Sequence, residues 1–183
     1  MTRKWKDSRG LTLVEMLCAV AILVLLGLLI NTGLQLAVHS YQDITAQEEL
    51  ELLAASLSDA LADDLRYAKF PDTDDDGNLK NYHSERYNGG KLHTVLSIGT
   101  GGENGGKDKG QLYANDYRVL PSGAYGSGGA YVIGKNDGTP GLTITYDKDT
   151  RLFKVDLTVK QAEGELFAEA HLTVRRLSPD TEK

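Results

Sequence analysis

Three aspartates in the middle of this 183-residue sequence have types and spacing that could bind a metal ion. Asp72, Asp74 and Asp76 alternate in the stretch "DTDDDGN", and Gly77 follows them directly. Carboxylates at this spacing, ahead of a glycine turn, can converge on a hard cation such as Ca²⁺. His83 stands where a bidentate glutamate would be needed to close the site, so a solvated acidic turn is the alternative.

A fourth acid, Glu15, lies near the start of a long apolar run. It is the only Asp, Glu, Lys or Arg between Leu11 and Ile30, a stretch about as long as the ~20 residues of a membrane-spanning helix. A carboxylate in hydrocarbon costs several kcal/mol unless it is paired, which indicates a specific use for Glu15. The alternative is a chance glutamate near the membrane interface, whose carboxylate reaches water.

The charge distribution indicates an exported protein with a cytoplasmic N-terminus. The net charge is −6, yet basic residues gather just before the apolar run, at Arg3, Lys4, Lys6 and Arg9. A basic head followed by an apolar run holds the N-terminus on the cytoplasmic side. The acidic remainder argues against a broad nucleic-acid-binding surface. Cys18, the single cysteine, lies in the apolar run and has no partner for an intrachain disulfide.

The elements around these residues predict one long helix followed by an antiparallel sheet. Apolar residues continue at steps of three and four over Leu50, Leu53, Leu57, Leu61, Leu65 and Ala68. A helix from about Leu11 to about Ala68 would be roughly 87 Å long at 1.5 Å per residue.

Phe70–Asn78 is expected to be a stop signal and an acidic loop. Strands are expected over 91–99, 130–134 and 165–177, with a hairpin over 142–161 and either one strand or a pair of short strands over 111–120. The predicted fold class is α+β, with an amphipathic helical half packed on the C-terminal sheet.

The segment "RGLTLVEMLCAVAIL" resembles the N-terminal segment of type IV pilins and of the pseudopilins of type II secretion. The family pattern is a basic leader, a glycine, an apolar residue, Thr-Leu-Ile/Val-Glu and a long apolar helix. Leu11 stands where the family most often has phenylalanine. The resemblance implies cleavage after Gly10, N-methylation of Leu11, and assembly in which Glu15 pairs with the Leu11 amine of a neighbouring subunit.

The resemblance also implies an organisation and a set of partners. Residues 1–10 would be a leader that is removed, 11–36 the transmembrane and filament-core helix, 37–69 an amphipathic helix, and 70–183 an extracytoplasmic β-rich head. The partners would be other pilin subunits, a prepilin peptidase and methyltransferase, an inner-membrane assembly platform and membrane lipid. No catalytic residue and no cofactor other than the possible Ca²⁺ is expected.

Two other classes of protein remain open at this stage. One is a single-pass membrane protein with an uncleaved signal anchor and an extracytoplasmic sensor or binding domain. The other is a secreted enzyme with an ordinary signal peptide, although no small-residue cleavage site closely follows the apolar run.

Overall fold

The long N-terminal helix predicted from the sequence is present. A computed structural model describes residues 12–87, 93–101, 107–120, 125 and 129–179. In it α1 spans Leu13–Arg66, 54 residues without a proline. The chain divides into two compact units, Met1–Thr45 and Ala46–Lys183, and α1 contributes to both.

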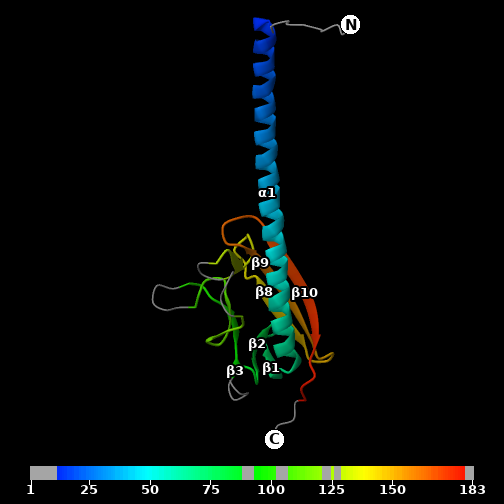
Figure 1. The fold of residues 1–183 in the computed structure, drawn as a ribbon. Helices are drawn as coiled ribbons and strands as arrows, with labels where there is room; N and C mark the ends of the chain where they lie inside the picture. The colour runs from blue at the N-terminus through cyan, green and yellow to red at the C-terminus, as the bar shows by residue number, and fades with distance from the viewer. Residues whose placement is uncertain (1–11, 88–92, 102–106, 121–124, 126–128, 180–183) are drawn as a thin grey trace. The chain divides into compact units, whose positions relative to one another are not determined.

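The second unit contains short strands in three antiparallel sheets (Figure 1). The strands are β1 (Lys69–Thr73), β2 (Leu79–His83), β3 (His93–Thr94), β4 (Leu96–Ile98), β5 (Leu112–Ala114), β6 (Tyr117–Arg118), β7 (Tyr131–Ile133), β8 (Leu142–Asp147), β9 (Leu152–Gln161) and β10 (Phe167–Arg175). The α+β fold class is therefore confirmed, and the chain folds as a helix followed by antiparallel sheets.

The largest sheet is built around β9, the longest strand. Strand β10 pairs with one edge of β9 along its whole length, from Phe167 opposite Lys160 to Arg175 opposite Leu152. Strands β8 and β7 share the other edge, pairing with the first and last parts of β9 respectively. The two smaller sheets have the orders β1-β2-β3 and β4-β5-β6.

The strand predictions hold for the C-terminal half of the chain and fail around residue 70. The hairpin over 142–161 and the closing strand over 165–177 are confirmed as β8–β9 and β10. The predicted loop at Phe70–Asn78 is wrong in its first part, because β1 pairs with β2 despite Pro71. β1 is an edge strand with an irregular register, a position where a residue without an N–H is tolerated.

The single strand predicted over 91–99 is also wrong. The structure divides that stretch into β3, which pairs with β2, and β4, which pairs with β5 in a different sheet. The side chain of Asn115 fills the break, since its Oδ1 accepts from the Val95 N–H at 2.9 Å and its Nδ2 donates to the His93 carbonyl at 3.0 Å.

The core lies where the second half of α1 meets the β9 sheet. Leu50, Leu57, Leu61 and Leu65 are at most 1% exposed, and they form one face of the helix, as the spacing predicted. The buried face of β9 consists of Phe153, Val155, Leu157 and Val159, and Figure 1 shows this sheet running alongside the helix. Helix and sheet thus cover each other's apolar faces.

This arrangement predicts that Leu57→Ala destabilises the folded head by about 2–5 kcal/mol, because it removes a fully buried side chain and leaves a cavity. Leu52→Ala is the matched control, since Leu52 is 69% exposed on the same helix and its loss should cost no more than about 0.5 kcal/mol. Urea unfolding of the full chain in detergent, followed by circular dichroism, measures both. Equal losses in the two variants would contradict the packing described here.

Candidate functional site

The first turn of α1 places Thr12 and Glu15 in reciprocal contact. The Thr12 N–H donates to Glu15 Oε2 at 2.8 Å, and the Glu15 N–H donates to Thr12 Oγ1 at 3.3 Å. The Thr12 hydroxyl also donates to Glu15 Oε2, at 2.9 Å. This is a capping box, in which the residue before the helix and the third helical residue satisfy each other's backbone N–H groups. The carboxylate of Glu15 is therefore held by its own chain at the helix N-terminus.

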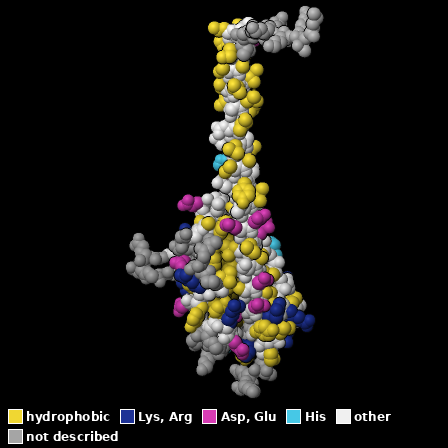
Figure 2. Space-filling model, in the orientation of Figure 1, with side chains coloured by type: hydrophobic (Ala, Val, Ile, Leu, Met, Phe, Trp, Pro, Cys, Tyr) yellow, Lys and Arg dark blue, Asp and Glu magenta, His cyan; other side chains and the backbone are white. Residues whose placement is uncertain are grey.

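The helix around Glu15 presents exposed apolar side chains on every face, and Figure 2 shows one of these faces. Large exposed residues recur from Leu13, which is 81% exposed, through Leu29 and Ile30 to Leu36. By length and composition α1 can cross a membrane. A helix that is apolar all round must be covered by lipid or by other apolar surfaces, and within Met1–Thr45 the described residues supply no such cover.

The processing residues predicted from the sequence lie outside the described part of the chain. Gly10 and Leu11 directly precede the first described residue, Thr12. Cleavage after Gly10, methylation of Leu11 and the role of Glu15 in assembly therefore remain predictions.

Comparison with known proteins bears on this same segment. The family model of the prokaryotic N-terminal methylation motif matches residues 5–31. The chain carries a prepilin-type N-terminal segment. No curated protein and no solved structure matches the chain.

The prepilin-type segment is typical of type IV pilins and pseudopilins, so the resemblance seen in the sequence is confirmed. The matched range runs from Trp5 to Asn31 in α1, and it includes both residues of the capping box. The β-rich residues that follow α1 lie outside the match, so their role has to be inferred from their own geometry.

In the second unit, the end of α1 is anchored by a buried carboxylate that the sequence analysis did not single out. Asp64 is only 7% exposed, and its two oxygens accept hydrogen bonds from the hydroxyls of Tyr82 and Ser84. Burial raises the pKa of Asp64, although the hydrogen bonds from Ser84 and Tyr82 and the charge of Arg86 oppose that shift. Burial and the Asp64 charge likewise raise the pKa of Tyr82. The contact fixes the last turns of the helix to β2 and the residues after it.

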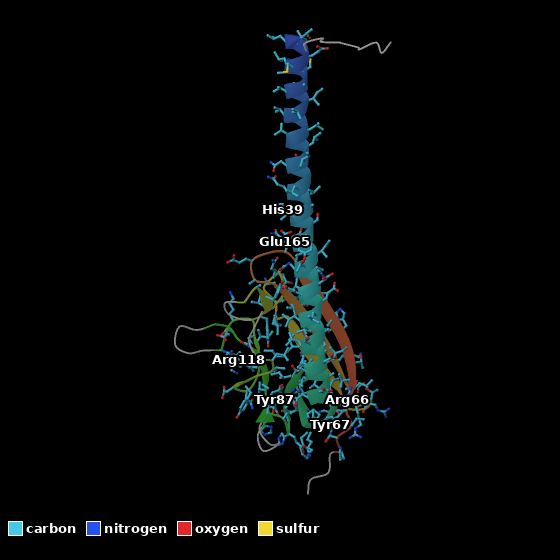
Figure 3. The ribbon with its side chains drawn as sticks, viewed as in Figure 1. His39, Arg66, Tyr67, Tyr87, Arg118 and Glu165 are labelled. Atoms are coloured by element: carbon cyan, nitrogen blue, oxygen red, sulfur yellow. The ribbon has the colours of Figure 1, made fainter. Side chains whose placement is uncertain are left out.

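A signal for this anchor was present in the sequence. Asp64 lies three residues after Leu61 and four before Ala68, so it shares the apolar face of the helix. An acid on that face requires a buried donor, and the hydroxyl groups of β2 and the following turn supply it. Figure 3 shows Arg66 and Tyr67 at the end of α1, and Tyr87 at the same end of this unit.

A second anchor joins the end of α1 to the residues after β10. Arg176 is 3% exposed; its Nε donates to the Ala68 carbonyl at 2.9 Å and its NH1 to the Tyr146 hydroxyl at 2.9 Å. The Leu177 N–H donates to the Arg66 carbonyl at 2.8 Å. These bonds satisfy carbonyl groups that the end of a helix leaves without intrahelical partners.

The acidic stretch forms the turn between β1 and β2, and its carboxylates differ in their surroundings. Asp74 accepts from the N–H groups of Asp76 and Asn78 at 3.1 and 2.7 Å and from Asn78 Nδ2 at 2.9 Å. The Asn78 side chain and the two N–H groups hold the pKa of Asp74 below its usual value. Asp72 accepts from Asn81 Nδ2 at 3.2 Å.

Asp74, the central carboxylate of the predicted metal site, thus accepts its hydrogen bonds from its own chain. Among the described residues, no group of three or more His, Cys, Asp or Glu is arranged to hold a metal ion. Calcium binding by Asp72, Asp74 and Asp76 remains a prediction from the sequence.

The buried carboxylate predicts a specific pH dependence. Because the folded-state pKa of Asp64 lies above its ordinary value of 3.8, the unfolded chain releases this proton at lower pH than the folded chain. The contribution of Asp64 to the free energy of unfolding is therefore largest below that value and declines as the pH rises through the folded-state pKa. Asp64→Asn cannot titrate and should lack this decline.

The measurement is the difference in free energy of unfolding between wild type and Asp64→Asn as a function of pH, from urea unfolding of the full chain in detergent. Asp63→Asn, which replaces the exposed neighbouring carboxylate, is the control. A wild-type curve that stays parallel to that of Asp64→Asn would show that Asp64 does not titrate differently in the folded state.

Proposed function

We propose that this chain is the precursor of a minor pilin or pseudopilin, a structural subunit of a type IV pilus-like or type II secretion-like filament. The matched N-terminal segment supports this class of protein. The glycine-rich connections of the head favour a minor subunit. In this proposal the chain has no enzymatic activity and acts through assembly.

The observation that carries the proposal is the lone Glu15 carboxylate at the start of an uncovered apolar helix. Packing of such helices side by side would cover their apolar surfaces. Each buried carboxylate would then need a positive partner, because an unpaired charge in a low-dielectric environment is strongly unfavourable. Cleavage after Gly10 would create that partner, the new amine of Leu11, on the neighbouring subunit.

The proposal assigns a place to three parts of the chain. Residues 1–10 are cytoplasmic and removed, 11–36 cross the membrane and later form the filament core, and 70–183 lie outside the membrane. A prepilin peptidase and methyltransferase, an inner-membrane platform and other pilin subunits act on the N-terminal segment. The helix is long enough for this topology, and the basic residues before it favour a cytoplasmic N-terminus.

The alternative is a single-pass membrane protein whose signal anchor stays uncleaved and whose β-rich unit is a sensor or binding domain. The two proposals differ in the N-terminus of the native protein. A filament subunit begins at methylated Leu11, whereas a signal-anchored protein keeps its basic leader.

We therefore expect N-terminal sequencing and intact-mass analysis of the protein from its native membrane to find Leu11 with one added methyl group. A chain in which Gly10 is replaced by a bulky residue should keep its leader and stay in the membrane. A native N-terminus at Met1 or Thr2 would contradict the proposal and favour the signal anchor.

Substitutions in the capping box separate two roles of Glu15, which are capping the helix and pairing with the amine of a neighbouring subunit. Glutamine can replace glutamate in a capping box, so Glu15→Gln keeps the helix N-terminus satisfied and removes only the charge. We expect Glu15→Gln and Glu15→Ala to reach the membrane in normal amounts but to be depleted from sheared filaments. Thr12→Ser, which keeps the capping hydroxyl, is the control and should assemble normally.

Filament incorporation of Glu15→Gln at the wild-type level would show that Glu15 serves the helix cap alone. Pairing with a neighbouring amine would then be wrong, even if the chain is a filament subunit.

A further inference from the structure

A groove of about 650 Å³ opens in the β-rich unit, among elements that the proposed assembly helix does not include. Strand β4 and the residues after it form one wall, and β7 with its connection to β8 forms the other. Apolar side chains from both walls lie in it, at Leu96, Ile98, Val132 and Leu142. A groove of this volume with an apolar lining is typical of a binding site.

Three lysines border the groove. They are Lys109 before β5, Lys135 after β7 and Lys160 near the end of β9. Among the described residues, no ion pair joins any of the three to a carboxylate, and Asp137 beside Lys135 is hydrogen-bonded to Thr139 at 2.6 and 2.9 Å. In a chain with a net charge of −6, this is a local positive site suited to an acidic ligand.

The groove thus combines an apolar lining with a basic border. Its ligand chemistry is that of a short acidic peptide segment.

The chain itself presents such a segment in the β1–β2 turn. The Gly77 N–H donates to the Asp74 carbonyl at 3.1 Å, and Gly77 has a φ of +81°, a left-handed conformation that suits glycine. Asp74 holds the turn together with its carboxylate, which leaves Asp75 and Asp76 exposed at the tip. No residue of this turn lines the groove, so the acidic and basic sites are separate surfaces of one molecule.

We propose that the lysine-bordered groove receives the β1–β2 turn of a second copy of this chain, with Asp75 and Asp76 against Lys109, Lys135 and Lys160. A contact between two different surfaces of identical subunits is heterologous, and it propagates into an open filament when the rotation between subunits does not close a ring. This inference rests on the proposed filament function and adds a contact between heads. The net negative charge of the chain disfavours a long polyanion as the occupant.

Charge reversal on the full-length chain tests the contact. Exposed charge pairs are individually weak, so Lys135→Glu or Asp75→Lys alone should lower the fraction of chain in sheared filaments by about fivefold. The two substitutions together should restore it, because the opposite charges again face each other. Lys154→Glu with Asp149→Lys is the matched control; both residues are exposed, and neither lies in the groove or the turn. Unchanged incorporation of both single variants, or a double variant that stays impaired, would overturn the proposal.

Cysteine cross-linking separates this inference from the proposed function. In a Cys18→Ala background, chains with Lys135→Cys are co-expressed with chains carrying Asp75→Cys, and native membranes are oxidised. Disulfide-linked dimers that depend on both substitutions would support the head contact, even if the native N-terminus proved uncleaved. Absence of these dimers where methylated Leu11 and Glu15-dependent filaments are found would overturn the contact alone. Binding of a DNA oligonucleotide that Lys135→Glu abolishes, without cross-linked dimers, would overturn it in favour of a polyanion.

Discussion

The folded head depends on mutual burial between one face of α1 and one face of the β9 sheet. Neither surface could remain stable alone in water, since each consists of a row of large aliphatic and aromatic side chains. The row from Leu50 to Leu65 lies against the alternating residues of β9, and β8 and β10 extend the same sheet on either side. The smaller sheets complete the same core through Tyr82 and Leu112, which are fully buried.

One helix therefore serves two environments. From Leu13 to Val38 most of its side chains are apolar and exposed, whereas from Leu50 onward a row of leucines on one face is buried. Polar groups at two places on the helix are satisfied within the chain. Glu15 is held by Thr12 at the start, and Asp64 is held by Tyr82 and Ser84 near the end. In both cases a hydroxyl group donates to the carboxylate.

The sequence predicts helices and strands correctly where apolar residues recur with a strong period, because burial of one face then dominates. The apolar run, the spacing of Leu50, Leu57, Leu61 and Leu65, and the alternation over 142–161 each specify a helix or strand by burial of a single face, and the structure confirms them. Pattern alone failed where tertiary contacts decide. Pro71 and the acidic residues obscured β1, which exists because β2 supplies the pairing partner.

In the candidate site too, some features follow from the sequence pattern and others only from tertiary contacts. The Thr-Leu-Val-Glu spacing identifies a family motif, whereas its capping geometry follows only from the hydrogen bonds. The spacing places Asp64 on the apolar face of the helix, but the sequence does not show that β2 supplies its buried donor. The lysines of the groove are dispersed between residues 109 and 160, and only the fold brings them to one opening.

The bonds from Arg176 and Leu177 to the end of α1 have a consequence for the order in which the chain matures. A ribosome makes these two residues long after the helix, yet they donate hydrogen bonds to the carbonyl groups of Arg66 and Ala68. Strand β10, which immediately precedes them, is likewise needed to complete the sheet against which the helix packs. The far end of the helix thus reaches its final form only after residue 177 has been synthesised, and a nascent chain that stalls before residue 167 leaves the leucine row without the outer strand of the sheet.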